Sequence, residues 1–374
     1  MSKRLLHTPE GVRDIYGIEY ENKLWSEQAL LKTIHSYGYQ EIQTPTFEFF
    51  DAFSREVGTT PSRELYKFFD KEGNTLALRP DFTPSIARCA SKYFMEEATP
   101  IRLCYSGNAF HNISELQGKW NEVTQIGADL INDNSVEADA EIIGLVVEAL
   151  RNSKLSRFLI SIGHVEYFKG LCEIAGLDEE TEDLLRDFVS GKNYFAAEEL
   201  LQSRDIKEPH RGNLLKVADL LRDMTSLSEA ESLADNERSY AAIKRLKDLY
   251  EVLKYYHAQD YVSFDLGMLS KYHYYTGMIF KAYTYGVGNP IVKGGRYNNL
   301  LRQFGKDAPA VGFVVVVDDL LLALSGQNVP LPTFAPTTSL YYGEGEYQVK
   351  LSEAFALRQE GHKVAMIRRD ESRS

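Results

Sequence analysis

The sequence predicts an α+β fold in which an antiparallel sheet is flanked by helices. A strand, a loop and a return strand follow one another over residues 101–130, the order of an antiparallel pair. A continuous β-branched run at residues 311–317 predicts a buried central strand. Apolar residues at helical spacing recur over residues 166–256, which predicts a helical insertion between the strands.

Length and composition narrow the function classes. The chain has 374 residues, enough for one large domain and a small one. Its net charge of −12 and the lack of a run of Lys and Arg count against nucleic-acid binding. The three cysteines, Cys89, Cys104 and Cys172, have neither metal-ligand spacing nor a disulfide pattern, which predicts a cytoplasmic protein. No apolar run reaches membrane-spanning length and no signal segment begins the chain, so we expect no membrane association, and neither a metal nor a cofactor.

The N-terminal part predicts a helix, a strand and a hairpin. An apolar stripe indicates a helix over residues 19–37, and residues 41–45 indicate a strand that ends at a proline. Residues 65–69 and 75–79 flank a turn and predict the hairpin. Taken alone, residues 19–45 fit an ordinary helix–strand unit equally well.

Two polar residues follow the second hairpin strand. Asp81 and Thr83 are two positions apart, so both side chains can reach one ligand. A carboxylate and a hydroxyl together suit an ammonium group. An alternative that fits equally well is a capping aspartate and a turn threonine before a helix.

The return strand at residues 122–129 carries a second polar pair. Gln125 and Asp129 are four positions apart and therefore lie on one face of this strand. A helix capped by Ser135 is expected over residues 135–152, followed by a strand at residues 158–163.

The stretch over residues 265–297 predicts a ligand pocket. Tyr274 and Tyr275 offer aromatic rings with polar tips, and Gly294 and Gly295 permit close backbone approach. Together they predict the floor of a pocket for a small flat ligand. The alternative is an aromatic hairpin that packs a core, which composition alone favours.

These motifs together resemble the class II histidyl-tRNA synthetase family. Its two histidine-recognition signatures are similar to the Tyr-Tyr-Thr-Gly element at residues 274–277 and the Gly-Gly-Arg-Tyr element at residues 294–297. The resemblance covers residues 7–322 and implies a class II synthetase-like antiparallel sheet flanked by helices. It also implies a homodimer formed through the helix and strand of residues 19–45.

The resemblance implies a histidine-binding site built from six side chains: Asp81, Thr83, Gln125, Asp129, Tyr274 and Tyr275. In this family the first acid and the hydroxyl hold the amino group, the glutamine contacts the backbone end and the second acid contacts the imidazole. Asp129 is shorter than the usual glutamate. The family arginine four residues before the first tyrosine is replaced by Ser270, so Arg296 or backbone donors are expected at the ligand carboxylate.

The family's ATP-binding residues are replaced in this sequence. His111 and Asp319 stand where the family has arginines for the α- and γ-phosphates. Ile113 replaces a glutamate, and Val316 replaces a glycine beside the adenine. A neutral histidine cannot replace a bidentate guanidinium, and an aspartate repels a triphosphate. We therefore expect no catalytic residues.

A histidine pocket without ATP-binding arginines is similar to the histidyl-tRNA synthetase-like regulatory subunits of ATP phosphoribosyltransferase. This resemblance implies a non-catalytic partner that activates the short-form catalytic subunit and senses L-histidine for feedback on the first step of histidine biosynthesis. It implies a homodimer within a hetero-oligomer. The alternatives are an active histidyl-tRNA synthetase, a paralogue that aminoacylates a protein side chain, and a tRNA-binding stress sensor. The replaced arginines count against the first two, and the acidic charge counts against the third.

The C-terminal part predicts a separate small segment. Prolines at residues 323–336 indicate a linker after a synthetase-like domain at residues 1–322. Residues 337–374 predict a βαβ unit, which resembles the first half of the family's anticodon-binding domain.

Overall fold

The fold is seen in a computed structural model, which describes residues 6–53, 60–113, 120–217, 221–222, 224–269, 274–332 and 335–369. The chain divides into two compact units. The first comprises residues 1–15 and 23–329, and the second comprises residues 16–22 and 330–374.

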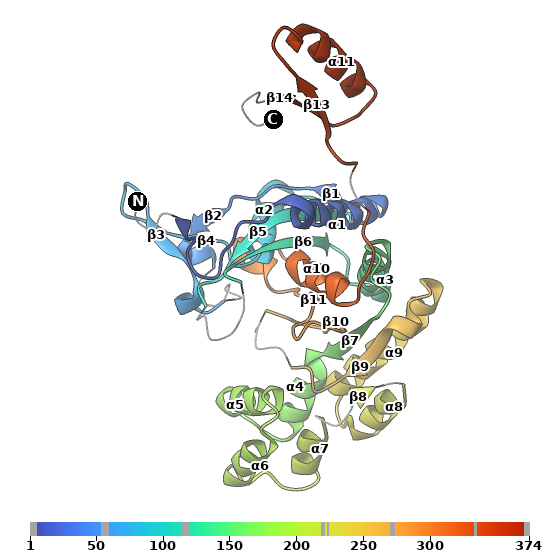
Figure 1. Ribbon diagram of the computed structural model, residues 1–374. Coiled ribbons are helices and arrows are strands. Elements are labelled where there is room, and N and C mark those ends of the chain that lie inside the picture. The colour runs from blue at the N-terminus through green and yellow to red at the C-terminus, as the bar shows by residue number, and fades with distance from the viewer. Residues whose placement is uncertain are drawn as a thin grey trace. The chain divides into compact units, whose positions relative to one another are not determined.

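The first unit is built on a nine-stranded sheet (Figure 1). In spatial order its strands are β1 (Gln40–Glu41), β5 (Ile101–Phe110), β6 (Glu122–Ile131), β12 (Ala310–Val316), β11 (Val292–Arg296), β10 (Met278–Thr284), β7 (Phe158–His164), β9 (Val262–Asp265) and β8 (Leu221–Arg222). The pairs β1–β5 and β7–β9 are parallel, and the other neighbours are antiparallel. The predicted α+β class with a mainly antiparallel sheet is confirmed.

Helices pack on this sheet and bury their apolar side chains. The helices outside the insertion are α1 (Gly17–Ser36), α2 (Thr83–Tyr93), α3 (Val136–Asn152) and α10 (Val317–Gly326). The predicted stripe of α3 is fully buried, and the Ser135 side chain accepts a hydrogen bond from the Ala138 N–H at 3.1 Å. The predicted helix and its cap are therefore confirmed.

A small three-stranded sheet carries the predicted hairpin. Its order is β2 (Phe47–Phe49), β4 (Thr75–Leu78) and β3 (Lys67–Phe69), and both pairs are antiparallel. The sequence did not predict β2, because a three-residue strand is too short for a periodic signal. The first unit also contains short 3-10 helices at Phe50–Ala52, Ser62–Glu64, Gln259–Tyr261 and Leu301–Phe304.

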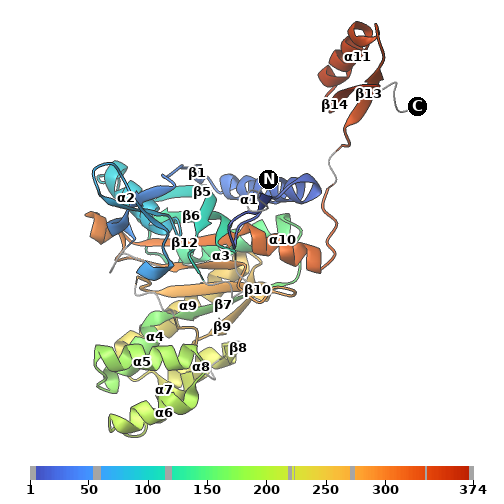
Figure 2. The same ribbon diagram turned by 60° about the vertical axis from the view of Figure 1, so that its left-hand side comes forward.

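The expected helical run separates β7 from β9. Its helices are α4 (Val165–Ile174), α5 (Glu179–Ser190), α6 (Tyr194–Ser203), α7 (His210–Lys216), α8 (Met224–Leu233) and α9 (Glu237–Tyr255). Figures 1 and 2 show α5 to α8 gathered beyond the β7 and β9 end of the sheet. Helix α9 packs on α3 and on α4, so it joins the insertion to the sheet domain.

The second unit contains a βαβ unit, as predicted. Strands β13 (Thr338–Tyr342) and β14 (Val364–Arg368) are parallel and are connected by α11 (Tyr347–Gln359). Over the described parts of the chain, no helix combines the length and apolar character that a membrane span requires. No cluster of His, Cys, Asp or Glu within those parts could hold a metal ion.

Candidate functional site

A cavity of about 510 Å³ lies on the central strands of the first unit. Strands β6, β11 and β12, the start of α2 and the segment before β10 form its wall. The structure brings all six predicted histidine-site side chains to this cavity: Asp81, Thr83, Gln125, Asp129, Tyr274 and Tyr275.

Two glycines allow an acid and a ring to lie directly on the sheet. Asp129, Gly312 and Gly295 are side by side on β6, β12 and β11. A Cβ atom on Gly312 would lie 1.9 Å from Oδ1 of Asp129, and one on Gly295 would lie 2.7 Å from a ring carbon of Tyr275. Only glycine fits these two positions, so the predicted close approach at Gly295 is confirmed.

The Asp129 carboxylate is the most deeply buried acid of the cavity wall, with 2% of the residue exposed. Its Oδ1 accepts a hydrogen bond from the Tyr297 hydroxyl, while Oδ2 has no hydrogen-bond partner within the described residues. Burial raises the pKa of Asp129 to about 7; the Tyr297 bond opposes this shift and the Asp81 charge adds to it. The sequence reasoning missed Tyr297 as part of the site.

Gln125 presents a second acceptor without a partner. The residue is 6% exposed, and its Oε1 makes no hydrogen bond to any described part of the chain. A buried acceptor without a donor costs free energy, and few are left in native proteins. Gln125 and Asp129 therefore offer two acceptors that a bound donor would satisfy.

Asp81 lies in the turn before α2 and at the cavity wall. Its Oδ1 accepts the Thr83 N–H at 3.0 Å where α2 begins, and the residue also lines the cavity. Burial raises the pKa of Asp81 to about 7, against the effects of the Thr83 bond and the positive Lys293.

The two predicted tyrosines form an aromatic wall. The ring centroids of Tyr274 and Tyr275 are 4.3 Å apart at 33°, and Tyr274 meets Tyr297 edge-on at 6.2 Å. Tyr275 also packs against Val165 and its apolar neighbours. The two tyrosines therefore contribute to core packing and also line the cavity.

The same cavity reaches the positions that resemble an ATP site. His111, Ile113, Val316 and Asp319 all line it. Positions 111 and 319, where the resemblance leads us to expect phosphate-binding arginines, carry a histidine and an aspartate. Ser270, which stands where the family has an arginine, lies outside the described residues.

Sequence comparisons agree with this architecture. The model of the histidyl-tRNA synthetase family matches residues 11–320. An ATP phosphoribosyltransferase regulatory subunit from Acetivibrio thermocellus is 38% identical over 361 residues, 96% of this chain and 86% of that protein. One from Clostridium kluyveri is 35% identical over 369 residues, 98% of this chain and 94% of that protein.

The chain belongs to the family of ATP phosphoribosyltransferase regulatory subunits.

Solved structures place this regulatory-subunit family on the synthetase fold. A crystal structure from Bacillus halodurans, described as an ATP phosphoribosyltransferase regulatory subunit/histidyl-tRNA synthetase, has a TM-score of 0.89 at 32% identity and covers 97% of this chain and 93% of its own. A histidyl-tRNA synthetase from Nostoc shares the fold, with a TM-score of 0.80 at 19% identity over 98% of this chain and 86% of its own.

One side chain of this regulatory-subunit chain that was expected at the ligand carboxylate lies outside the cavity. Arg296 does not line the cavity but is buried, with its Nη2 2.6 Å and its Nε 2.9 Å from Oδ1 of Asp139. Its Nη1 donates to the Asp133 carbonyl at 2.9 Å. Side chains alternate along a strand, so Arg296 is on the opposite face of β11 from Gly295 and cannot reach a ligand on the Gly295 face.

Among the described residues that line the cavity, Lys293 is the one lysine or arginine. It is two residues before Gly295 and therefore shares its face of β11. Period-2 alternation, applied from Gly295 in the sequence, would have selected Lys293 and rejected Arg296.

Proposed function

We propose that this chain is a histidine-sensing regulatory subunit of ATP phosphoribosyltransferase. It binds L-histidine in the cavity on β6, β11 and β12, activates the short-form catalytic subunit and transmits feedback inhibition to it. Family membership and the composition of the cavity support this proposal.

The carrying observation is the pair of buried acceptors, Gln125 Oε1 and Asp129 Oδ2, beside an aromatic wall. L-Histidine supplies both a flat ring and N–H donors. The imidazole lies against Tyr274 and Tyr275 and donates an N–H to Asp129. Each acceptor then gains the donor that the protein does not provide.

The amino-acid end of the ligand meets the charged groups of the wall. Asp81 and Thr83 hold the ammonium group, and Gln125 contacts the backbone end. Lys293 pairs with the carboxylate, in place of the family arginine. Each ionic group of histidine then has a partner of opposite charge in a partly desolvated cavity.

The chain itself is not an enzyme in this proposal. Adenylate formation needs preorganised cations at the phosphates. His111 and Asp319 line the cavity where such cations would stand, and this supports an amino-acid site without a nucleotide site. The chain acts in the cytoplasm as a homodimer within a hetero-oligomer, and tRNA binding is not expected at a net charge of −12.

Calorimetry with L-histidine tests the proposal directly. We expect saturable binding that does not require ATP, and binding about tenfold or more weaker in Asp129→Asn because a charge-assisted hydrogen bond is lost. Asp307→Asn is the matched control, since Asp307 pairs with Arg302 on the surface. Failure to bind L-histidine, or histidine-dependent ATP–pyrophosphate exchange by the chain alone, would contradict the proposal.

A further inference from the structure

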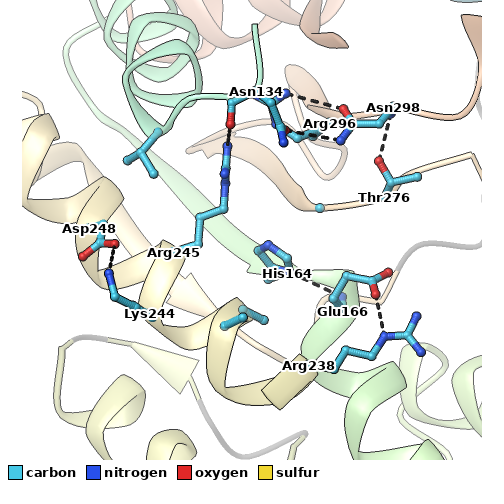
Figure 3. A pocket seen from close by; sticks show the side chains of 14 residues that line it. Asn134, His164, Glu166, Arg238, Lys244, Arg245, Asp248, Thr276, Arg296 and Asn298 are labelled. Atoms are coloured by element: carbon cyan, nitrogen blue, oxygen red, sulfur yellow. Dashed lines mark hydrogen bonds and ion pairs between the residues drawn. The ribbon is translucent and has the colours of Figure 1, made fainter. Parts of the chain in front are cut away.

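A second cavity of about 450 Å³ lies where helix α9 meets the sheet domain (Figure 3). The starts of α3 and α4, the Thr276–Gly277 segment and the end of β11 complete its wall. It shares no lining residue with the histidine cavity. On β11, Lys293 faces the histidine cavity and Arg296 faces this one.

The inner end of the second cavity holds two guanidinium groups and one carboxylate. Nη2 of Arg296 is 2.6 Å from Oδ1 of Asp139, and Nη2 of Arg245 is 2.7 Å from Oδ2 of the same residue. Asp139 is fully buried. The two cations share this one buried anion, and the charge of the Asp133 carboxylate also acts on Arg296.

The two arginines differ in the N–H donors that remain without a partner among the described residues. Every nitrogen of the Arg296 guanidinium donates to Asp139, Asp133, Ser135 or Asn298. Arg245 uses only Nε and Nη2, which donate to Asp139 and to the carbonyls of Asn134 and Ser135. Nη1 of Arg245 makes no hydrogen bond within the described part of the chain. Arg296 therefore forms the wall, and Arg245 offers donors to the cavity.

His164 supplies a second donor. It is 7% exposed, and its Nδ1 accepts the Glu166 N–H at 3.3 Å where α4 begins. This bond places the ring proton on Nε2, which has no hydrogen-bond partner among the described residues. Burial, with the charges of Arg245 and Arg296, lowers the pKa of His164 to about 3, so the ring is neutral at pH 7. Figure 3 shows the ring between Arg245 and Glu166.

The charged side chains at the outer rim of the cavity form ion pairs with one another. Arg238 donates to Glu166 at 2.6 Å and to Glu173 at 3.3 Å, and Lys244 pairs with Asp248 at 2.6 Å. These side chains are more exposed than Arg245 and are screened by solvent. Nη1 of Arg245 and Nε2 of His164, at the inner end, are therefore donors without a partner among the described residues of this cavity.

We propose that this second cavity binds a small metabolite through an oxyanion, a phosphate or carboxylate group that accepts from Nη1 of Arg245 and Nε2–H of His164. Guanidinium groups favour both oxyanions because their paired N–H donors match two oxygen atoms. The volume lies in the range of small-molecule sites. The inference does not depend on the histidine proposal, because the residues are separate.

A charge placed at the cavity wall tests the site without disturbing the ionic cluster. Ala241 is an exposed residue of α9 that lines the cavity. Ala241→Glu adds a carboxylate there, and Ala241→Gln is a neutral control of the same size; both residues favour helices. Inorganic phosphate and malonate, titrated by calorimetry at constant ionic strength, serve as the phosphate and carboxylate probes.

We expect at least one probe to bind saturably, about tenfold more weakly to Ala241→Glu and within about threefold of wild type to Ala241→Gln. The probe that binds more tightly identifies the oxyanion. NMR of the His164 Nε2–H, assigned with His164→Asn, should show a shift on addition of that probe. The proposal is overturned if neither probe binds saturably, if the two Ala241 variants bind alike, or if the imidazole signal does not move.

Discussion

At the residue scale, two carboxylates give the proposed histidine cavity a dependence on pH. The pKa values of Asp81 and Asp129 are both raised to about 7, mainly by burial. Bound L-histidine would place an ammonium group and an imidazole N–H beside them, which favours their charged forms. Binding should therefore release protons below pH 7, and the affinity for L-histidine should rise with pH up to about 7.

The same pKa shift predicts how stability depends on pH. Between pH 4 and pH 7 the unfolded chain has already lost the Asp129 proton that the folded protein keeps, so stability falls as pH rises. Asp129→Asn removes this dependence. From pH 5 to pH 8 its free energy of unfolding should rise relative to wild type by about 2–3 kcal/mol. Urea unfolding without ligand measures this change, and a constant difference would mean that Asp129 titrates at its ordinary value.

Comparing L-histidine with histamine as ligands isolates the role of Lys293. Lys293→Met should weaken L-histidine binding about tenfold, because the ligand carboxylate loses its cation. Histamine is histidine without the carboxylate, so its affinity should be the same for both proteins. Calorimetry with the four combinations gives the coupling. An equal loss for both ligands would assign Lys293 to the wall and not to the carboxylate.

At the element scale, the alternation of side chains along a strand explains why one of the predicted site residues does not line the cavity. The elements were predictable where a periodic pattern ran long enough, as in α3, or where an apolar run was continuous, as in β12. The six site side chains follow strand and loop positions, and the structure gathers them. Arg296 was misplaced because a motif names residue types, whereas β11 turns each successive side chain to the opposite face.

The site features that the sequence did not predict depend on contacts between residues far apart in the chain. The hydrogen bond from Tyr297 to Asp129 joins residues 168 positions apart, and no local pattern predicts such a pair. The orphaned Gln125 and Asp129 acceptors likewise become visible only when the neighbouring strands are in register.

The ionic cluster that joins α3, α9 and β11 makes a prediction about stability. Asp139→Asn leaves Arg245 and Arg296 without their carboxylate and should lower the free energy of unfolding by about 3–5 kcal/mol. Asp248→Asn breaks the exposed Lys244 pair on the same helix and should cost less than about 0.5 kcal/mol. Denaturant unfolding compares the two variants. Similar stabilities would show that the cluster does not hold α9 to the sheet domain.

At the scale of the whole molecule, the fold does not distinguish a regulator from a synthetase. The Nostoc histidyl-tRNA synthetase shares this fold at 19% identity. The proposed distinction rests on the cavity, which has an aromatic wall and acids but has His111 and Asp319 where the resemblance leads us to expect the family's phosphate arginines. Regulation further requires that L-histidine bind one state of the assembly more tightly than another.

The central claim is tested by the ATP phosphoribosyltransferase activity of a short-form catalytic subunit from the same organism, with and without this chain, across an L-histidine titration. The chain should raise the activity, and L-histidine should then suppress it. Asp129→Asn should still activate but require about tenfold or more L-histidine for half-inhibition. A catalytic subunit that this chain leaves unchanged, together with histidine-dependent ATP–pyrophosphate exchange by the chain alone, would contradict the account and identify a synthetase.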